Sequence, residues 1–253
     1  MKITFLGTGT SQGIPMIANN DPVCLSTDPK DKRLRSSVMI SWGDVNYIID
    51  CGPDFRQQML RENVQSINGV LFTHEHADHT AGMDDLRPYT YQMGEVPIYA
   101  QKRVIENLKI RFVYIFETKN RYAGAPKLSE NLVGSGSFEL NGVEVTPINV
   151  MHGNLPIVAY RFGKIAYITD LKTIAEKEKQ KLQNLEILVL NALRIEDHPT
   201  HLNLEEALAF VDEIKPKKAY LTHISHKLGF HEMVQKSLPD NVFLSYDGLQ
   251  LEV

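Results

Sequence analysis

The sequence is poor in cysteine and contains no long apolar run. Cys24 and Cys51 are its only cysteines, which are too few for the disulfide framework of a small secreted protein. No stretch is long and apolar enough to cross a bilayer, and the start of the chain lacks the apolar region of a signal peptide. We therefore expect a cytoplasmic protein that has no membrane partner.

Positive charge is also scarce. The formal net charge is −4, whereas a broad nucleic-acid surface needs clustered lysine and arginine. Asp28 and Asp31 interrupt the main basic cluster, which favours a solvated loop over a phosphate-binding track. The cluster consists of Lys30, Lys32, Arg33 and Arg35. We therefore do not expect nucleic acid as a partner.

The composition is that of an ordinary globular protein. Hydrophobic residues make up 43% of the chain and charged residues 23%, which excludes a disordered or fibrous class. A length of 253 residues suits one α/β domain, and no linker, repeat or low-complexity tract divides it. We expect residues 1–253 to form a single domain.

Short apolar runs rich in β-branched residues recur along the chain and predict strands. They lie at residues 3–6, 38–42, 47–49, 70–72, 143–150, 158–162, 165–168, 187–190, 219–221 and 242–244. Helical patterns lie at 53–62, 103–112 and 173–182. The clearest helix starts at Asn203, where Glu206 completes a capping box, and it ends before Pro216. Together these elements predict an α/β fold of two mixed sheets flanked by helices.

The segment 73–79 (THEHADH) is the strongest functional signal in the chain. It directly follows the predicted strand at 70–72 and holds five potential metal ligands within six residues. A polar loop arising by chance is a poor explanation for such a dense set. The segment therefore predicts a metal site at the junction between a strand and a helix.

The spacing within this segment suits two metal ions. His74 and His76 can direct their imidazoles at one ion, while Asp78 and His79 turn towards a second. Glu75 is expected to point elsewhere. Nitrogen and carboxylate ligands without a thiolate favour Zn²⁺ or Mn²⁺, with Fe²⁺ as a further candidate.

Three further ligand candidates stand at the ends of predicted strands. His152, Asp170 and His223 each follow an apolar run. A single polar residue in such a position is more often a cap or a surface residue, but three of them beside the HxHxDH motif favour a shared site.

The order of these motifs resembles the metallo-β-lactamase superfamily over nearly the whole chain. Asp50 in the segment IIDCG comes first, followed by HxHxDH and the three strand-end residues. The resemblance implies an αββα sandwich with two metals in a groove at one edge. It also implies that Asp50 orients the ligands through hydrogen bonds. The implied ligands are His74, His76 and His152 for metal one, Asp78, His79 and His223 for metal two, and Asp170 as the bridge.

Within that superfamily the chain resembles the PhnP-like branch, whose members hydrolyse small cyclic or linear phosphodiesters. The segments that carry this resemblance are 7–15 (GTGTSQGIP), 33–37 (RLRSS), 84–87 (DDLR) and 191–194 (NALR), followed by Thr200 and His201. Similarity to tRNase Z is more distant.

The chain departs from that branch at one point. Members of the branch often hold a structural zinc with three cysteines and a histidine, and the matching positions here are Asn19, Asp21, Cys24 and His226. Since two thiolates are missing, we expect this zinc to be absent or weak. Other contacts should then hold the loop 18–28.

The resemblance also suggests catalytic residues. Asp78 would act as a catalytic metal ligand, and His201 is the candidate general acid for the leaving alkoxide. His198 is expected to be a solvent-exposed loop residue. Arg87 and Arg194 could each contact a phosphate oxygen or pair with nearby carboxylates, and the sequence leaves both alternatives open.

Together these observations predict a metal-dependent phosphodiesterase that hydrolyses small phosphodiesters with water activated by two divalent ions. The alternatives are a thioesterase or lactonase on the same fold, a tRNase Z-like nuclease, and a metal-binding protein without activity. The sequence does not determine the oligomeric state, and a homodimer is the candidate that the general frequency of such assemblies offers.

Overall fold

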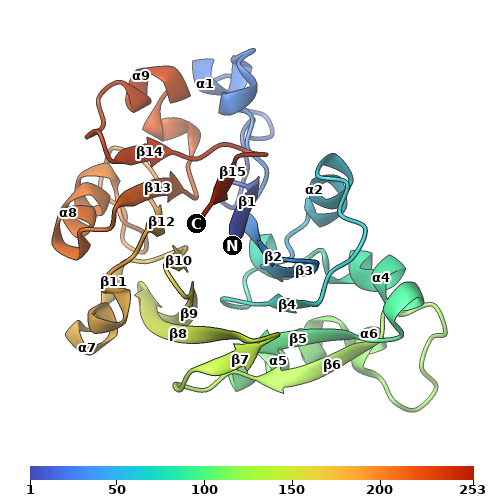
Figure 1. Ribbon diagram of the computed structural model, residues 1–253. Helices are drawn as coiled ribbons and strands as arrows, with labels where there is room; N and C mark the ends of the chain where they lie inside the picture. Colours follow the sequence, from blue (N-terminus) through green and yellow to red (C-terminus); the bar gives the residue numbers. More distant parts are fainter.

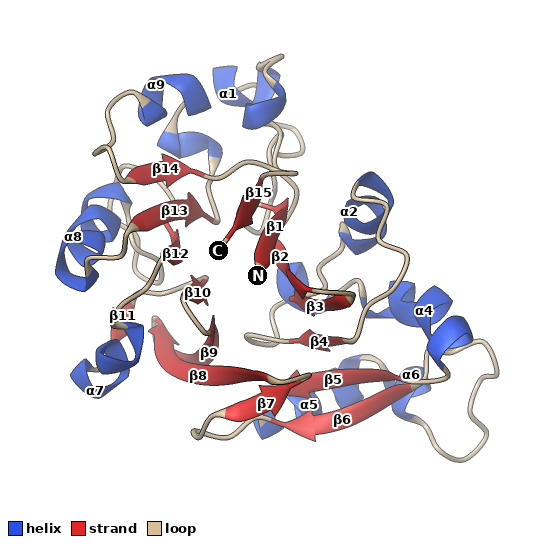
Figure 2. Cartoon of the chain, viewed as in Figure 1, coloured by secondary structure: helices blue, strands red, loops and turns tan.

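The computed structural model describes residues 1–253 as two β-sheets packed together, with helices on the outside (Figures 1 and 2). The first sheet has the strand order β15-β1-β2-β3-β4-β5-β6. Its strands are β1 (Lys2–Gly7), β2 (Ser37–Trp42), β3 (Val45–Ile49), β4 (Gly69–Leu71), β5 (Val96–Ala100), β6 (Leu128–Leu132) and β15 (Gln250–Glu252).

The second sheet has the strand order β11-β8-β9-β10-β12-β13-β14, and β7 pairs with β8 beside this path. Its strands are β7 (Phe138–Leu140), β8 (Val143–His152), β9 (Leu155–Phe162), β10 (Ile165–Ile168), β11 (Thr173–Ile174), β12 (Ile187–Asn191), β13 (Lys218–Thr222) and β14 (Val242–Leu244).

Helices and short 3₁₀ turns connect the strands. The α-helices are α1 (Pro22–Leu25), α2 (Phe55–Arg61), α3 (Ala77–Thr80), α4 (Arg87–Met93), α5 (Lys102–Arg111), α6 (Val113–Phe116), α7 (Glu176–Lys179), α8 (Leu204–Ile214) and α9 (His231–Gln235). The 3₁₀ turns are η1 (Pro29–Asp31), η2 (Met83–Leu86), η3 (Gln180–Leu182) and η4 (His226–Leu228). None of the helices combines the length and the apolar character needed to span a bilayer.

Three hydrophobic clusters define the layers. One joins the two sheets, where Phe5 of β1 shares a cluster with Tyr160 of β9. The second lies between the first sheet and its helices and includes Leu108 of α5. The third lies between the second sheet and its helices and includes Phe210 of α8. The arrangement is the αββα sandwich of two mixed sheets that the sequence predicts, and this prediction is confirmed.

Both sheets contain a parallel half. The strands from β3 to β6 run parallel to one another, and so do β10, β12, β13 and β14. Parallel strands of one sheet end at the same edge, so polar residues that follow them gather there although they are distant in sequence. This geometry positions the site described below.

All ten predicted strands are present, and the predicted helix starting at Asn203 is α8. Its capping box is complete, because Asn203 Oδ1 accepts a hydrogen bond from Glu206 N at 2.8 Å and Glu206 Oε2 accepts one from Asn203 N at 3.0 Å. The helix ends at Ile214, before Pro216, as expected.

The helix predicted at 173–182 is wrong in its first part. Thr173 and Ile174 form β11 and pair with Met151 and Val150 of β8. The backbone of Ala175 remains extended, and only then do α7 and η3 follow. The β-branched pair gains more from an open sheet edge than from a helix, because β-branched side chains lose rotamer freedom in helices.

Candidate metal centre

The seven predicted ligands come together in the structure. They are supplied by the loop after β4 and α3 (His74, His76, Asp78 and His79), the end of β8 (His152), and the residues after β10 and β13 (Asp170 and His223). Their ligand atoms form overlapping groups of three in which all atoms lie within 4.8 Å of one another. Ligands that are up to about 150 residues apart in the sequence thus meet, because they follow strands that end at the same edges of the two sheets.

The first group consists of three imidazoles, those of His74, His76 and His152. His74 Nε2 lies 3.0 Å from His76 Nδ1. The other nitrogen of His74 faces Thr73 Oγ1 at 3.0 Å, and His152 Nδ1 donates to the carbonyl oxygen of Thr200 at 2.8 Å. These outer contacts fix the orientations of the His74 and His152 rings and direct the other nitrogen of each towards the group.

The second group combines Asp78, His79 and His223. His79 Nε2 lies 3.1 Å from Asp78 Oδ2 and 3.2 Å from Asp170 Oδ2. His223 Nε2 lies 3.2 Å from Asp170 Oδ1. The Asp170 carboxylate also belongs to a group with His74 and His79. It therefore lies between the two groups, as a bridging ligand would.

Asp50 contacts both groups from outside, the first through Thr73 and the second through His79. Its fully buried carboxylate accepts hydrogen bonds from Thr73 N and Thr73 Oγ1, each at 2.8 Å, and from His79 Nδ1 at 2.7 Å. The bond to His79 leaves Nε2 of that ring directed at Asp78 and Asp170. Asp50 thus has the orienting position that the family resemblance implies.

Three residues of this centre adopt left-handed backbone conformations. The φ angles are 67° at Asp50, 55° at Asp170 and 55° at His223. Residues other than glycine rarely adopt this region, at a cost of about 1–3 kcal/mol each, and they do so mainly where surrounding structure enforces it. Each of the three follows a strand, so the turn aims its side chain back across the strand ends.

The electrostatics and the unsatisfied atoms fit a bound cation. Burial opposes ionisation of Asp170, but His223 and then His79 hold its pKa well below the usual value. Burial lowers the pKa of His74 well below the usual value, which keeps that ring neutral. His79 Nε2 and both ring nitrogens of His223 are buried without a hydrogen-bond partner. His79 differs, because burial lowers its pKa but the carboxylates of Asp78, Asp50 and Asp170 outweigh burial and raise it well above the usual value, so this ring would release a proton when a metal binds. Ionised carboxylates, neutral imidazoles and free ring nitrogens are the states in which these groups bind metals.

His201 lies beside the predicted ligands. Its Nε2 is 2.9 Å from Asp170 Oδ1, and its ligand atom groups with those of His152 and Asp170. Burial lowers the pKa of His201 to about 4, against the opposing hydrogen bond and charge of Asp170. His198, expected to be an exposed loop residue, is partly buried instead, and its Nδ1 lies 3.0 Å from His201 Nδ1.

The two ambiguous arginines are engaged with their own neighbours. Arg87 Nη2 donates to both oxygens of Asp84 at 2.7 and 2.8 Å. The Arg194 guanidinium donates to backbone carbonyls, among them that of Glu196 at 3.2 Å. Pairing with a nearby carboxylate is therefore the arrangement observed for Arg87, and Arg194 binds its own loop.

Asn191 supports the Asp170 turn but is not among the predicted site residues. Its Oδ1 accepts from Leu171 N at 2.7 Å and its Nδ2 donates to the Leu171 carbonyl at 3.1 Å. Asn191 ends β12, the parallel neighbour of β10. The same rule that selected Asp170, a polar residue at the end of an apolar strand, would have selected it.

The positions that correspond to the structural zinc site form hydrogen bonds. Asn19 Nδ2 lies 3.3 Å from His226 Nε2, and the Asp21 side chain caps α1 by accepting from Val23 N. Cys24 is buried, and its sulfur accepts from the backbone N–H of Met16. These contacts help to hold the loop 18–28. The absence of a zinc at this place stays a prediction.

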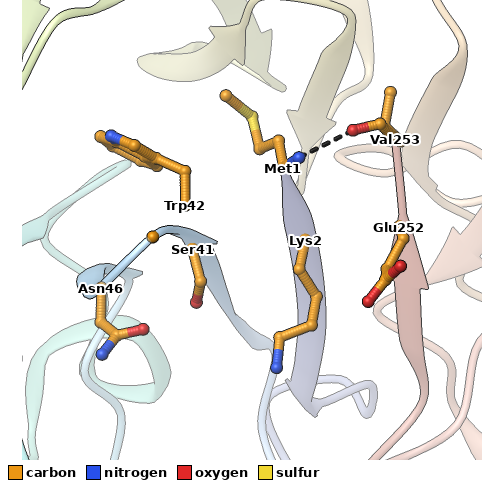
Figure 3. Close-up of a pocket in the computed structure, with 8 residues that line it drawn as sticks. Met1, Lys2, Ser41, Trp42, Asn46, Glu252 and Val253 are labelled. Atoms are coloured by element: carbon orange, nitrogen blue, oxygen red, sulfur yellow. Dashed lines mark hydrogen bonds between the residues drawn. The ribbon is translucent and has the colours of Figure 1, made fainter.

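A separate surface groove of about 620 Å³ lies away from this centre (Figure 3). It is formed by the start of β1, the β2–β3 turn and the end of the chain, where the Met1 amino group donates to the Val253 carbonyl at 2.7 Å. None of the predicted site residues lines this groove.

A family model described as a beta-lactamase superfamily domain matches residues 45–224, which include all seven predicted ligands. The chain belongs to the metallo-β-lactamase superfamily. Together with the His and Asp groups described above, this membership supports a metal-dependent hydrolase.

Solved structures narrow the relationship to the PhnP-like branch. A diphosphatase from the PhnP family is 40% identical in sequence, with a TM-score of 0.93 and coverage of 100% of this chain and 97% of that one. Zn²⁺-bound PqqB from Methylobacterium extorquens is 18% identical, with a TM-score of 0.80 over the full length of both chains, and shares the fold. The resemblance noted from the sequence is thereby confirmed.

Curated relatives carry different names. An octanoyltransferase from Porphyromonas gingivalis is 38% identical over 254 residues, covering 99% of this chain and 51% of that protein. A ribonuclease Z from Methanococcus maripaludis is 27% identical over 174 residues, covering 65% of this chain and 49% of that protein. The chain thus spans about half the length of these two relatives.

Replacement of Asp170 tests the dinuclear assignment. We expect Asp170→Ala to lose at least one of two bound metal ions and nearly all turnover, because the carboxylate lies between both ligand groups. Elemental analysis of the purified protein measures the occupancy, and Asp212→Ala on the exposed face of α8 is the control. Asp170→Asn removes the negative charge but keeps a residue that tolerates the left-handed backbone, so it separates loss of the ligand from strain at this turn. Unchanged metal content in both variants would refute the assignment.

Substitution of Cys24 tests the expected absence of a structural zinc. We expect no third stoichiometric metal there, because one thiol and one imidazole do not complete a tetrahedral site. The measurement is the zinc content of the wild type and of Cys24→Ser after extensive dialysis. Loss of one zinc on this substitution, with the other two metals retained, would contradict the prediction.

Proposed function

We propose that the protein is a metal-dependent phosphodiesterase acting on small cyclic or linear phosphodiesters. The observation that carries the proposal is the position of His201, a protonatable ring whose Nε2 lies 2.9 Å from Asp170 Oδ1 at the edge of both ligand groups. The 40% identity to a PhnP-family diphosphatase, over nearly its whole length, supports phosphoryl chemistry.

The chain would hold two divalent ions, with Zn²⁺ or Mn²⁺ as the first candidates and Fe²⁺ as a third. When bound, the ions would supply an activated water and neutralise negative charge on the phosphoryl oxygens. One position would use the three imidazoles of the first group. The other would use the second group, in which Asp78 is a partly buried carboxylate ligand. Asp170 would bind at both.

His201 would protonate the leaving oxygen. Its Nε2 faces the centre through Asp170, whereas Nδ1 contacts Thr200 Oγ1 at 3.0 Å and His198. The burial that lowers its pKa to about 4 favours the neutral ring in the free protein. The negative charge of a bound phosphodiester would favour the protonated ring, so that His201 carries a proton to donate to the leaving oxygen.

An RNA-processing phosphodiesterase is the second candidate. Ribonuclease Z proteins are 24–27% identical to this chain, and a ribonuclease Z from Borrelia garinii is matched over 93% of its length. The chemistry would be the same, but the net charge of −4 offers little to a tRNA backbone. Small substrates are therefore the preferred class.

Acyl-group hydrolysis or transfer is less well supported. About half of the octanoyltransferase relative has no counterpart in this chain, so its activity need not reside in the shared part. Both cysteines are buried, Cys51 completely, which leaves no thiol exposed as an acyl acceptor. A thioesterase or lactonase on the same fold remains an outcome for the substrate test.

The substrate class is tested by a panel assayed with the metal-loaded enzyme. We expect turnover of bis(p-nitrophenyl) phosphate, a cyclic nucleotide or a diphosphate diester, and none of a thioester, a lactone or a lactam. A tRNA precursor with a 3′ extension distinguishes the nuclease. Asp170→Ala is the control for contaminating activity. Faster turnover of the thioester or lactone than of every phosphodiester would overturn the proposal.

Replacement of His201 tests its role as a general acid. We expect His201→Ala to keep its metals and to lose about 10²-fold or more in rate for substrates with alkoxide leaving groups. A nitrophenolate leaves without a proton, so an activated aryl ester should be affected much less. Rate constants for both substrate types decide the question. An equal loss for the two would assign His201 to binding or packing instead.

A further inference from the structure

We propose that the ion pair between Glu75 and Arg103 is a positioning device for the first metal position, the one formed by His74, His76 and His152. The inference rests on the metal-binding part of the proposed function and is independent of the substrate class. Neither Glu75 nor Arg103 belongs to the seven predicted ligands. Their role would be to hold the ligand-bearing segments in register.

Glu75 stands in the chain between two of those ligands and turns its side chain away from them. Its Oε1 accepts a hydrogen bond from Arg103 Nη1, and its side chain is only 15% exposed. Its other oxygen, Oε2, is buried without a partner. A largely buried carboxylate that lost this cationic partner would carry a desolvation cost, so the pairing favours one position for this part of the loop.

Arg103 extends the connection to a second ligand-bearing segment. Its Nη2 donates to the carbonyl oxygen of Pro156 at 2.5 Å. Pro156 belongs to β9, next to Leu155, and Leu155 pairs with His152 across the β8–β9 hairpin. One guanidinium therefore joins the loop that carries His76 to the hairpin that carries His152.

The helix that carries Arg103 is itself firmly placed. The buried face of α5, which includes Val104 and Leu108, packs into the cluster beneath the first sheet, beside β5 in Figure 1. From its last turn Arg111 Nη1 donates to the Glu75 carbonyl at 2.6 Å and to Thr80 Oγ1 at 3.0 Å. Helix α5 therefore contacts Glu75 at two points: Arg103 binds the Glu75 side chain, and Arg111 binds the Glu75 backbone carbonyl.

The first group needs such support more than the second. His76 is exposed, so packing alone does little to restrain its ring. In the second group His79 is fully buried and is oriented by the Asp50 carboxylate. Loss of the Glu75–Arg103 pair should therefore weaken one metal position and spare the other. Contacts that orient ligands in this way typically change metal affinity about 10- to 100-fold.

The test measures metal affinity without any substrate. Zn²⁺ binding is followed by competition with a chromophoric chelator, and Co²⁺ absorption reports the ligand geometry, for wild type, Glu75→Gln, Arg103→Met and the double variant. We expect each single variant to lose about 10- to 100-fold in affinity at one position only. The double variant should lose no more than either single one. Lys102→Met, which removes an adjacent but 78% exposed charge on the same helix, should match wild type.

Unfolding of the chelator-treated proteins separates positioning from general stability. If Arg103→Met lowers the affinity at one position while the metal-free unfolding midpoint stays near that of Lys102→Met, the pair acts on the metal ligands. Arg103→Lys, which keeps the charge but not the forked geometry, should recover part of the affinity. Wild-type affinities and Co²⁺ spectra in the variants would overturn this inference alone. Equal weakening of both positions would also overturn it, whereas a wild type that binds no metal would remove the proposed centre as well.

Discussion

The buried carboxylate of Asp50 is the interaction on which the rest of the centre depends. It is fully buried and satisfied by three donors, two from Thr73 and one from His79 Nδ1. An ionised or hydrogen-bonded carboxylate in such a place tolerates little displacement, because any lost bond leaves a buried polar atom unpaired. The β3 end, the β4 end and the first turn of α3 are thereby locked together before any metal enters.

Packing of the two sheets explains the strained backbone of the site. Asp50 and His223 turn into the left-handed region directly after a strand, and Asp170 does so one residue further on. Two β-sheets packed face to face supply the rigidity that holds these turns, since the layer between them is filled by fully buried side chains such as Tyr160 and Tyr167. The packing energy of the sandwich therefore offsets the backbone strain at its edge. Such strain, compensated by the surrounding structure, is typical of functional sites.

The ligand set and its surroundings have separate chemical tasks. Imidazoles and carboxylates that gather at the strand ends determine that a divalent cation is favoured, and many reactions are compatible with that alone. Selectivity for a substrate must come from groups around the centre, and His201, whose Nε2 lies 2.9 Å from Asp170 Oδ1, is one of them. The contacts from α5 to the Glu75 segment are those through which we propose that the outer helix layer influences the centre without supplying a ligand.

The sequence alone was enough to predict ten of the fifteen strands, the capped helix at Asn203 and the seven residues that the structure brings together, namely the six of the two ligand groups and Asp170 between them. These signals are local, because an apolar run, a capping box or an HxHxDH segment is complete within a few residues. Other features depended on contacts between distant segments. The pairing of Thr173 and Ile174 with β8, the contact of His198 with His201, and the reach of Arg103 to both Glu75 and Pro156 follow from tertiary packing. No short pattern encodes them, since each partner acquires its neighbour only when the sheets and helices have assembled.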